Sequence, residues 1–130
     1  MRSYSSVAVA VALGVPSKWL DNLLSHHRLP GVDRGRQGIV RRISDTGLLA
    51  IEVVRLLVAD LTVSIGRAAE LTRIALESRD GGQSILTTPS GAALVLPLVE
   101  IERRLRAQIV EAVEMVAERP RGRPPRARSK

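Results

Sequence analysis

Apolar residues recur with helical spacing at the amino end of this chain of 130 residues. Residues 6–13 are almost entirely apolar, and beyond Gly14-Val15-Pro16 a stripe continues at Leu20, Leu23 and Leu24. Glycine adopts turn dihedrals easily, and proline disfavours helical backbone in the residue before it. The pattern predicts two short helices joined by a tight turn, which is a helix-turn-helix arrangement.

Residues 30–44, which read PGVDRGRQGIVRRIS, predict a β-hairpin wing. Its glycines allow a tight tip, and its β-branched residues favour strands. Arginine has planar donors that suit phosphates and groove edges. The alternative is a solvated loop, but four basic groups within nine residues exceed what solubility needs. The arginines of this segment are Arg34, Arg36, Arg41 and Arg42.

Two further helices and a small hairpin are expected in the middle of the chain. Ser44 and Asp45 suit a helix start, and the helix to about residue 59 is apolar almost all round, so it is expected to be central. Ser64 begins a fourth helix, to about residue 76, with a solvated ladder of charges. Residues 84–88 and 92–96 flank Pro-Ser-Gly and predict the hairpin.

Residues 98–118 predict one long helix of about 30 Å. Apolar residues recur along it at intervals of three and four. A stripe of that length has no obvious partner in so small a chain, so we expect a homodimer seam, parallel or antiparallel. The alternative is that the helix packs onto the amino-terminal domain. The stripe consists of Leu98, Ile101, Leu105, Ile109, Ala112, Met115 and Val116.

The charge of the chain is concentrated at its two ends. The net charge of +7 divides into +5 over residues 1–44, −4 over residues 45–118 and +6 over residues 119–130. With a pI near 11.3, this distribution is typical of a nucleic-acid binder. Two aromatics, Tyr4 and Trp19, are too few for base-stacking platforms on single strands.

The predicted fold is mainly α and has three parts. A winged helix-turn-helix DNA-binding domain spans residues 1–78, a small β-hairpin and a dimerisation helix span residues 79–118, and residues 119–130 form a basic tail that cannot fold alone. The apolar run at residues 7–15 is not expected to be a signal peptide, because helical spacing continues beyond it. No stretch reaches about 18 apolar residues, so we expect a cytoplasmic protein at the nucleoid.

The order of these elements resembles the winged-helix DNA-binding domain of the MerR family. Over residues 5–76 the resemblance rests on the turn at Leu13-Gly14-Val15, on Leu20, on the sequence RLPG at residues 28–31 and on Arg41-Arg42 before Ser44. It implies a recognition helix in the major groove, a wing on the phosphate backbone and a long dimerisation helix after the domain.

Pro120-Arg121-Gly122-Arg123-Pro124 looks like an AT-hook. Glycine lets the backbone lie on the floor of a narrow A·T minor groove, where a guanine amino group would clash, and the two arginines extend along the groove. The alternative is a chance occurrence in an Arg- and Pro-rich chain. The resemblance implies that A·T-rich DNA is bound beside the site of the first domain.

Candidate DNA contacts lie opposite the leucines of the second helix, in the wing and in the tail. Trp19 could instead be core packing, and His26 a polar helix end. The candidates are Ser17, Lys18, Trp19, Asn22, His26, Arg28, Arg34, Arg36, Arg41, Arg42, Arg119, Arg121, Gly122, Arg123, Pro124 and Arg126.

The sequence thus predicts a homodimeric protein that binds double-stranded DNA and regulates transcription. An architectural, nucleoid-associated protein is the close alternative, and an antitoxin-like or phage accessory protein with a protein partner is another. An enzyme is not expected, because no nucleophile and base, phosphate loop or ligand cluster can be assembled from these residues. No cofactor or metal is expected, and the chain has no cysteine.

Overall fold

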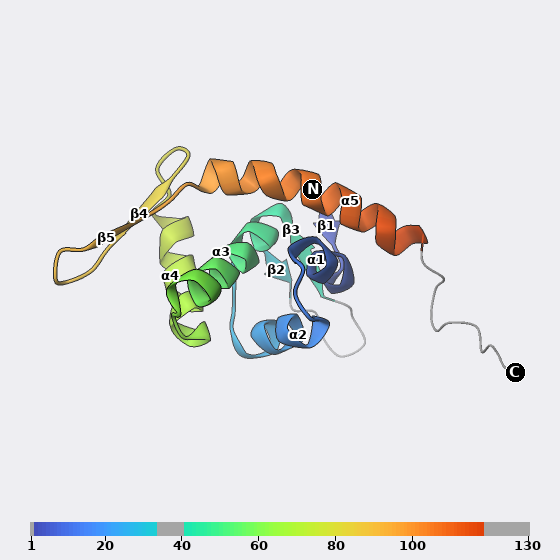
Figure 1. Ribbon diagram of the computed structural model, residues 1–130, viewed down its shortest axis with the longest axis horizontal. Helices are drawn as coiled ribbons and strands as arrows, with labels where there is room; N and C mark the ends of the chain where they lie inside the picture. The colour runs from blue at the N-terminus through green and yellow to red at the C-terminus, as the bar shows by residue number, and fades with distance from the viewer. Residues whose placement is uncertain (1, 34–40, 119–130) are drawn as a thin grey trace, which may run out of the picture.

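The computed structural model describes residues 2–33 and 41–118, which are mainly helical as the sequence predicts (Figure 1). The helices are α1 (Ser6–Leu13), α2 (Ser17–His26), α3 (Asp45–Leu61), α4 (Ile65–Glu77) and α5 (Leu98–Glu118). The strands are β1 (Ser3–Tyr4), β2 (Val32–Asp33), β3 (Arg42–Ser44), β4 (Ser84–Thr87) and β5 (Ala93–Leu96). The expected boundaries agree with these to within about two residues.

Serine hydroxyls begin the helices where the sequence predicts them. Ser44 Oγ accepts a hydrogen bond from the N–H of Gly47 at 3.2 Å, and Ser64 Oγ accepts one from the N–H of Arg67 at 3.3 Å. Each bond satisfies a backbone donor that the first turn of a helix leaves free. Gly14 ends α1. It has a φ of 67°, the left-handed conformation that glycine adopts without strain.

A three-residue break separates α1 from α2 and bends the chain by 119° between them. The N–H of Val15 donates to the carbonyl of Ala10, and the N–H of Leu20 donates to that of Pro16. Within residues 2–33 and 41–118, no single helix has the length and apolar composition of a membrane span. Only α1 and α2 together meet those two criteria, across this bend.

The first sheet has the strand order β1-β3-β2 and is antiparallel. Ile43 of β3 lies opposite Tyr4 of β1 on one side and opposite Val32 of β2 on the other. Both strands of the hairpin expected over residues 30–44 are therefore present. Residues 34–40, which include Arg34 and Arg36, lie outside the described residues. β1 was not predicted, because two residues are too few to show a strand period.

A close backbone approach fixes the sheet to the start of α3. The carbonyl of Gly31 accepts hydrogen bonds from the N–H and the hydroxyl of Ser44, both at 2.9 Å. Gly31 has a φ of 78°, and a Cβ built on it would collide with the backbone nitrogen of Gly47. A Cβ on Gly47 would collide with the carbonyl oxygen of Gly31. Both positions therefore need glycine.

The core is built around α3, as its apolar pattern predicts. Ala50, Ile51, Val53 and Val54 are completely buried. α1 is apolar on every side and packs against α2 and along α5, which runs across both α1 and α3 (Figure 1). A helix without a polar face needs cover all round, and α5 supplies part of that cover.

Five of the seven residues expected to form a dimer seam are buried within their own chain, so the expectation that these five contact a partner was wrong. α1 and α3 present apolar surface to the stripe within the same chain, and the alternative of packing onto the amino-terminal domain is what the structure has. Met115 remains 45% exposed and Val116 is half-buried. The stripe residues that are at most 3% exposed are Leu98, Ile101, Leu105, Ile109 and Ala112.

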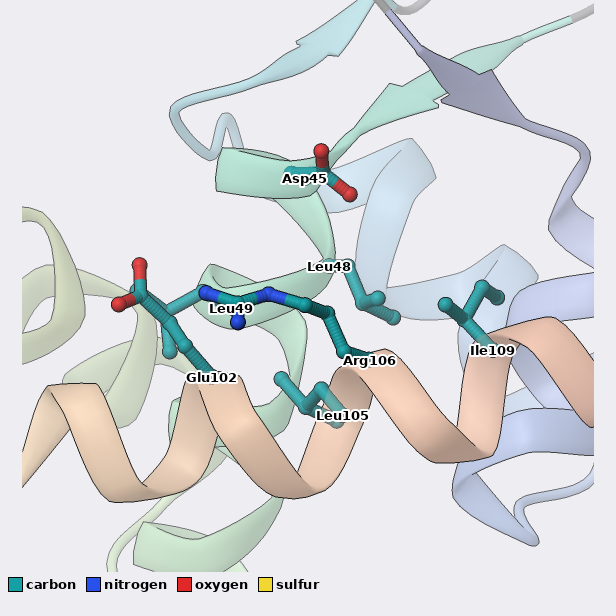
Figure 2. A pocket seen from close by; sticks show the side chains of 7 residues that line it. All are labelled: Asp45, Leu48, Leu49, Glu102, Leu105, Arg106 and Ile109. Atoms are coloured by element: carbon teal, nitrogen blue, oxygen red, sulfur yellow. The ribbon is translucent and has the colours of Figure 1, made fainter.

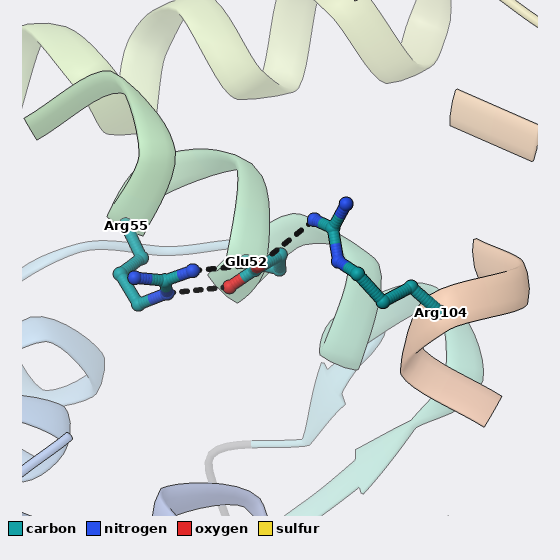
Figure 3. Close-up of polar contacts among 3 residues, drawn as sticks. All are labelled: Glu52, Arg55 and Arg104. Carbon is teal, nitrogen blue, oxygen red and sulfur yellow. Dashed lines mark hydrogen bonds and ion pairs between the residues drawn. The ribbon is translucent and has the colours of Figure 1, made fainter. Parts of the chain in front are cut away.

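A buried carboxylate joins α3 to α5 (Figure 3). Glu52 is 1% exposed and accepts hydrogen bonds from Arg55 at 2.6 and 2.9 Å and from Arg104 of α5 at 3.3 Å. The hydrogen bond with Glu52 is the main reason why the pKa of Arg55 is raised. The carboxylate is thus paired on two sides, which a buried charge requires.

A second ion pair fixes α5 to the loop after α4 and predicts a pH-dependent stability. Arg79 donates to Glu102 at 2.9 and 2.8 Å, and this bond lowers the pKa of Glu102 below the ordinary 4.5. Because the folded-state pKa is the lower one, the pair stabilises the fold at neutral pH, and that contribution disappears as the pH falls through the lowered pKa. Arg79→Ala should cost less than about 1 kcal/mol, because both side chains are partly exposed.

Urea unfolding at pH 7 and pH 3 measures this effect. The parent chain and Arg79→Ala should differ in free energy of unfolding at pH 7. The difference should become smaller at pH 3, where the bond of Arg79 to the carbonyl of Gly81 remains. Arg103→Ala, which removes the exposed pair with Glu100, is the matched control and should change little at either pH. A difference between the parent chain and Arg79→Ala that is equal at both pH values would contradict the assignment.

Candidate nucleic-acid interface

The two faces of α2 differ as the leucine spacing predicts. Leu20, Leu23 and Leu24 are completely buried, and they anchor the helix on the core. The side that faces away from the core is polar and consists of Ser17, Lys18, Asp21, Asn22, Ser25 and His26, all exposed. Among these, the Nδ1–H of His26 donates to the carbonyl of Asn22 at 2.9 Å.

Trp19 and Arg28 lie at the margins of this face. Trp19 is half-buried and packs against the core, so the packing alternative holds for the buried part of its ring. Arg28 is exposed just after α2, and its carbonyl accepts a hydrogen bond from Arg73 of α4 at 3.5 Å. Arg73 therefore adds a cation beside the exit of α2 that the sequence alone did not place there.

Arg41 joins the base of the β2–β3 hairpin to the outward face of α2. Its guanidinium donates to Asp21 at 3.2 Å and to the hydroxyl of Ser25 at 2.8 Å. Asp21 thus pairs with a residue twenty positions away in the sequence. The two elements that carry the candidate contacts therefore share one polar connection.

Arg42 joins β3 to β1 instead. It donates to the hydroxyl of Ser3 at 3.1 Å and to the carbonyl of Ser3 at 3.2 Å. A guanidinium has five N–H groups, so two bonds leave donors for a further acceptor. Arg41 and Arg42 thus each join two elements of the fold, and each keeps N–H donors for an anion.

The remaining candidates cannot be located on the described surface. Arg34 and Arg36 belong to residues 34–40, outside the described part of the chain. The tail lies outside it as well, with the candidates Arg119, Arg121, Gly122, Arg123, Pro124 and Arg126. Their proposed contacts rest on the sequence alone.

The described residues give the exposed face of α2 hydrogen-bonding groups and charge, and no residue of α2 lines a pocket. A hollow of about 520 Å³ lies between β1 and α5 and is lined by Tyr4, Arg42 and Val113 among others. The pocket between α3 and α5 has a volume of about 110 Å³, and Arg106, one of its lining residues, extends toward Glu102 (Figure 2). Ligand pockets usually enclose about 300–1,000 Å³, so this one is a gap in the packing. Over residues 2–33 and 41–118, no group of three or more His, Asp or Glu side chains is placed to hold a metal ion.

Comparison with known proteins gives the chain no family. No family model, no curated protein and no solved structure matches it. Three features of the molecule therefore bear on its function. They are the exposed face of α2, its connection to the hairpin and the charge of the chain.

Proposed function

We propose that the chain binds double-stranded DNA as a winged helix-turn-helix protein and regulates transcription. In this proposal α2 enters the major groove and the β2–β3 hairpin is the wing on the phosphate backbone. The observation that carries it is the polar face of α2, which is exposed and joined through Arg41 to the residue that begins β3 of a hairpin rich in arginine. The 119° bend and the short glycine-containing turn also agree with helix-turn-helix geometry.

The distribution of charge supports the same interface. The +5 of residues 1–44 and the +6 of residues 119–130 flank a middle segment of −4, so a duplex is attracted to the two ends of the sequence. The tail would add contacts in a neighbouring A·T-rich minor groove. Two tethered elements on one duplex can raise affinity by about 10²-fold without new kinds of contact.

Fluorescence anisotropy with labelled duplexes tests this proposal. Lys18→Glu, on the exposed face of α2, should weaken binding at least about 10-fold, since it replaces an attraction to phosphate by a repulsion. Arg103→Glu makes the same charge change on α5 and should alter affinity less than about twofold. Lys18 is preferable to Arg41, because Arg41 joins the hairpin to α2 through Asp21 and Ser25, and its loss would change the interface itself.

A chain that ends at residue 118 distinguishes the contribution of the tail to binding from that of α2 in the same assay. It should still bind, but log affinity should fall with log salt less steeply, by about 0.9 for each phosphate that the tail neutralises in the full chain. An unchanged slope would remove the tail from the interface. Failure of the full chain to bind any duplex at low salt would refute DNA binding altogether.

An architectural role is the second candidate, and one observation favours it. The exposed face of α2 has few side chains suited to bidentate base recognition, with Asn22 the clearest of them. An AT-hook-like tail also tolerates many sequences. Footprinting decides between the two: a palindromic protected site favours a regulator, and broad coverage that follows A·T content favours an architectural protein.

A further inference from the structure

The β4–β5 hairpin exposes an apolar face that no charge interrupts. Ile85 and Val95 lie directly opposite each other across the strands, and each is 52% exposed. The inward face, with Ser84, Leu86 and Leu96, is buried. The sequence has no charged residue anywhere between residues 81 and 99. Exposed strands usually carry charges that prevent pairing with other chains, and this hairpin has none.

β5 presents the open edge of the hairpin. β4 packs against α4, while among the described residues β5 pairs only with β4, and the hairpin projects from the rest of the molecule (Figure 1). The N–H of Thr88 donates to the carbonyl of Ala92 at 2.8 Å. Hydrogen-bonded pairs alternate along an antiparallel ladder, so residues 94 and 96 bond to β4. Ala93 and Val95 therefore direct their N–H and C=O groups away from it.

We propose that this edge binds a second copy of the chain, with β5 antiparallel to β5 of the partner across a two-fold axis at Leu94. In that register Ala93 of each copy lies opposite Val95 of the other, so the outward N–H and C=O groups meet. The next register would set Ala93 opposite Pro97, which has no N–H to donate. The result is a four-stranded sheet with one continuous apolar outer face.

The inner side of the hairpin also has apolar surface to cover near this axis. Leu94 is half-buried and lines a groove of about 270 Å³ that is mostly apolar. Leu61, which is 51% exposed, and Pro97 also line it, and Asp60 and Arg104 are its two charged residues. A two-fold axis at Leu94 brings the grooves of both copies to the same side of the new sheet. Leu94 of one copy would then lie beside Leu94 of the other.

A second copy suits this surface better than a charged partner. The hairpin has no charge with which to select an acidic or basic protein, whereas two uncharged edges pair without repulsion, and a two-fold contact uses the same surface twice. The hairpin lies away from α2, so the contact does not depend on the proposed DNA binding (Figure 1). The contact involves one short strand of each copy, which predicts a weak association.

Sedimentation equilibrium of the full chain without DNA tests the proposal. Above the Kd the mass should approach twice 14.1 kDa. Val95→Lys places a charge on the outer face, and Ala93→Pro removes an outward donor at an edge position, where proline is tolerated. Each should weaken association at least about 10-fold while the circular dichroism spectrum is retained. Val110→Lys is the matched control on α5, where Val110 is 50% exposed, and should leave the dimer unchanged.

Three results would overturn the proposal. One is a monomeric chain at concentrations up to about 1 mM. Another is a dimer that survives Val95→Lys and Ala93→Pro. The third is a dimer that Val110→Lys abolishes but the hairpin variants keep, which would move the contact to the outer face of α5. Slowed amide exchange of Ala93 and Val95 at high protein concentration would support the hairpin contact directly.

Discussion

Replacing Gly47 by alanine should lower the free energy of unfolding by about 3 kcal/mol, the upper end of the cost of overpacking. The added methyl group would press on the carbonyl oxygen of Gly31, a backbone atom that cannot swing aside as a side chain can. Any relief would separate the first sheet from the start of α3 and weaken the hydrogen bonds between Gly31 and Ser44. Urea unfolding followed by circular dichroism measures this decrease.

Gly66→Ala is the matched control, because Gly66 also lies in the first turn of a helix. A Cβ there would meet only His27, at an ordinary contact distance of 3.6 Å. Alanine has the higher helix propensity, so this variant should be as stable as the parent or more stable by up to about 1 kcal/mol. If Gly47→Ala behaved in the same way, the close approach of Gly31 and Gly47 would be wrong.

Leu105→Ala should lower the free energy of unfolding by about 2–5 kcal/mol, at any protein concentration. Leu105 is 3% exposed and fills the contact between α5 and the amino-terminal domain, so its removal leaves a cavity inside one chain. Val110→Ala, on the exposed side of the same helix, should change the free energy by less than about 0.5 kcal/mol. Unfolding at two protein concentrations tests both expectations.

The same measurement tests whether the apolar stripe of α5 is buried within its own chain or pairs two chains. If the stripe of α5 paired two chains, stability would rise with protein concentration, and Leu105→Ala would abolish that dependence. A decrease in stability that is independent of concentration fits the burial of Leu105 within its own chain. The hairpin contact proposed above is too weak to mimic a seam of this kind at low micromolar concentration.

Local features of the fold could be predicted because their signals lie close together in the sequence. A serine three residues before the N–H that it caps predicts the starts of α3 and α4, and the spacing of Leu20, Leu23 and Leu24 predicts the buried side of α2. The partner of α5 could not be predicted in this way. A stripe at intervals of three and four is the same whether the surface that it meets belongs to its own chain or to another.

The candidate site likewise has one part that could be predicted from local sequence signals and one part that could not. The exposed side of α2 follows from its leucines, because the polar side of an amphipathic helix is fixed once the apolar side is known. The bonds of Arg41 to Asp21 and Ser25, and of Arg73 to the carbonyl of Arg28, join residues 16 to 45 positions apart. No local period marks such pairs, so they emerge only when the sheet and α4 are in place.

The position of α5 across α1 and α3 limits how the protein can be divided for study. A fragment that stops at residue 78 retains every helix of the proposed DNA-binding region but leaves apolar flanks of α1 and α3 bare, and bare apolar surface promotes aggregation. Binding experiments on a shortened protein should therefore retain residues up to 118, and fusion partners belong beyond that point.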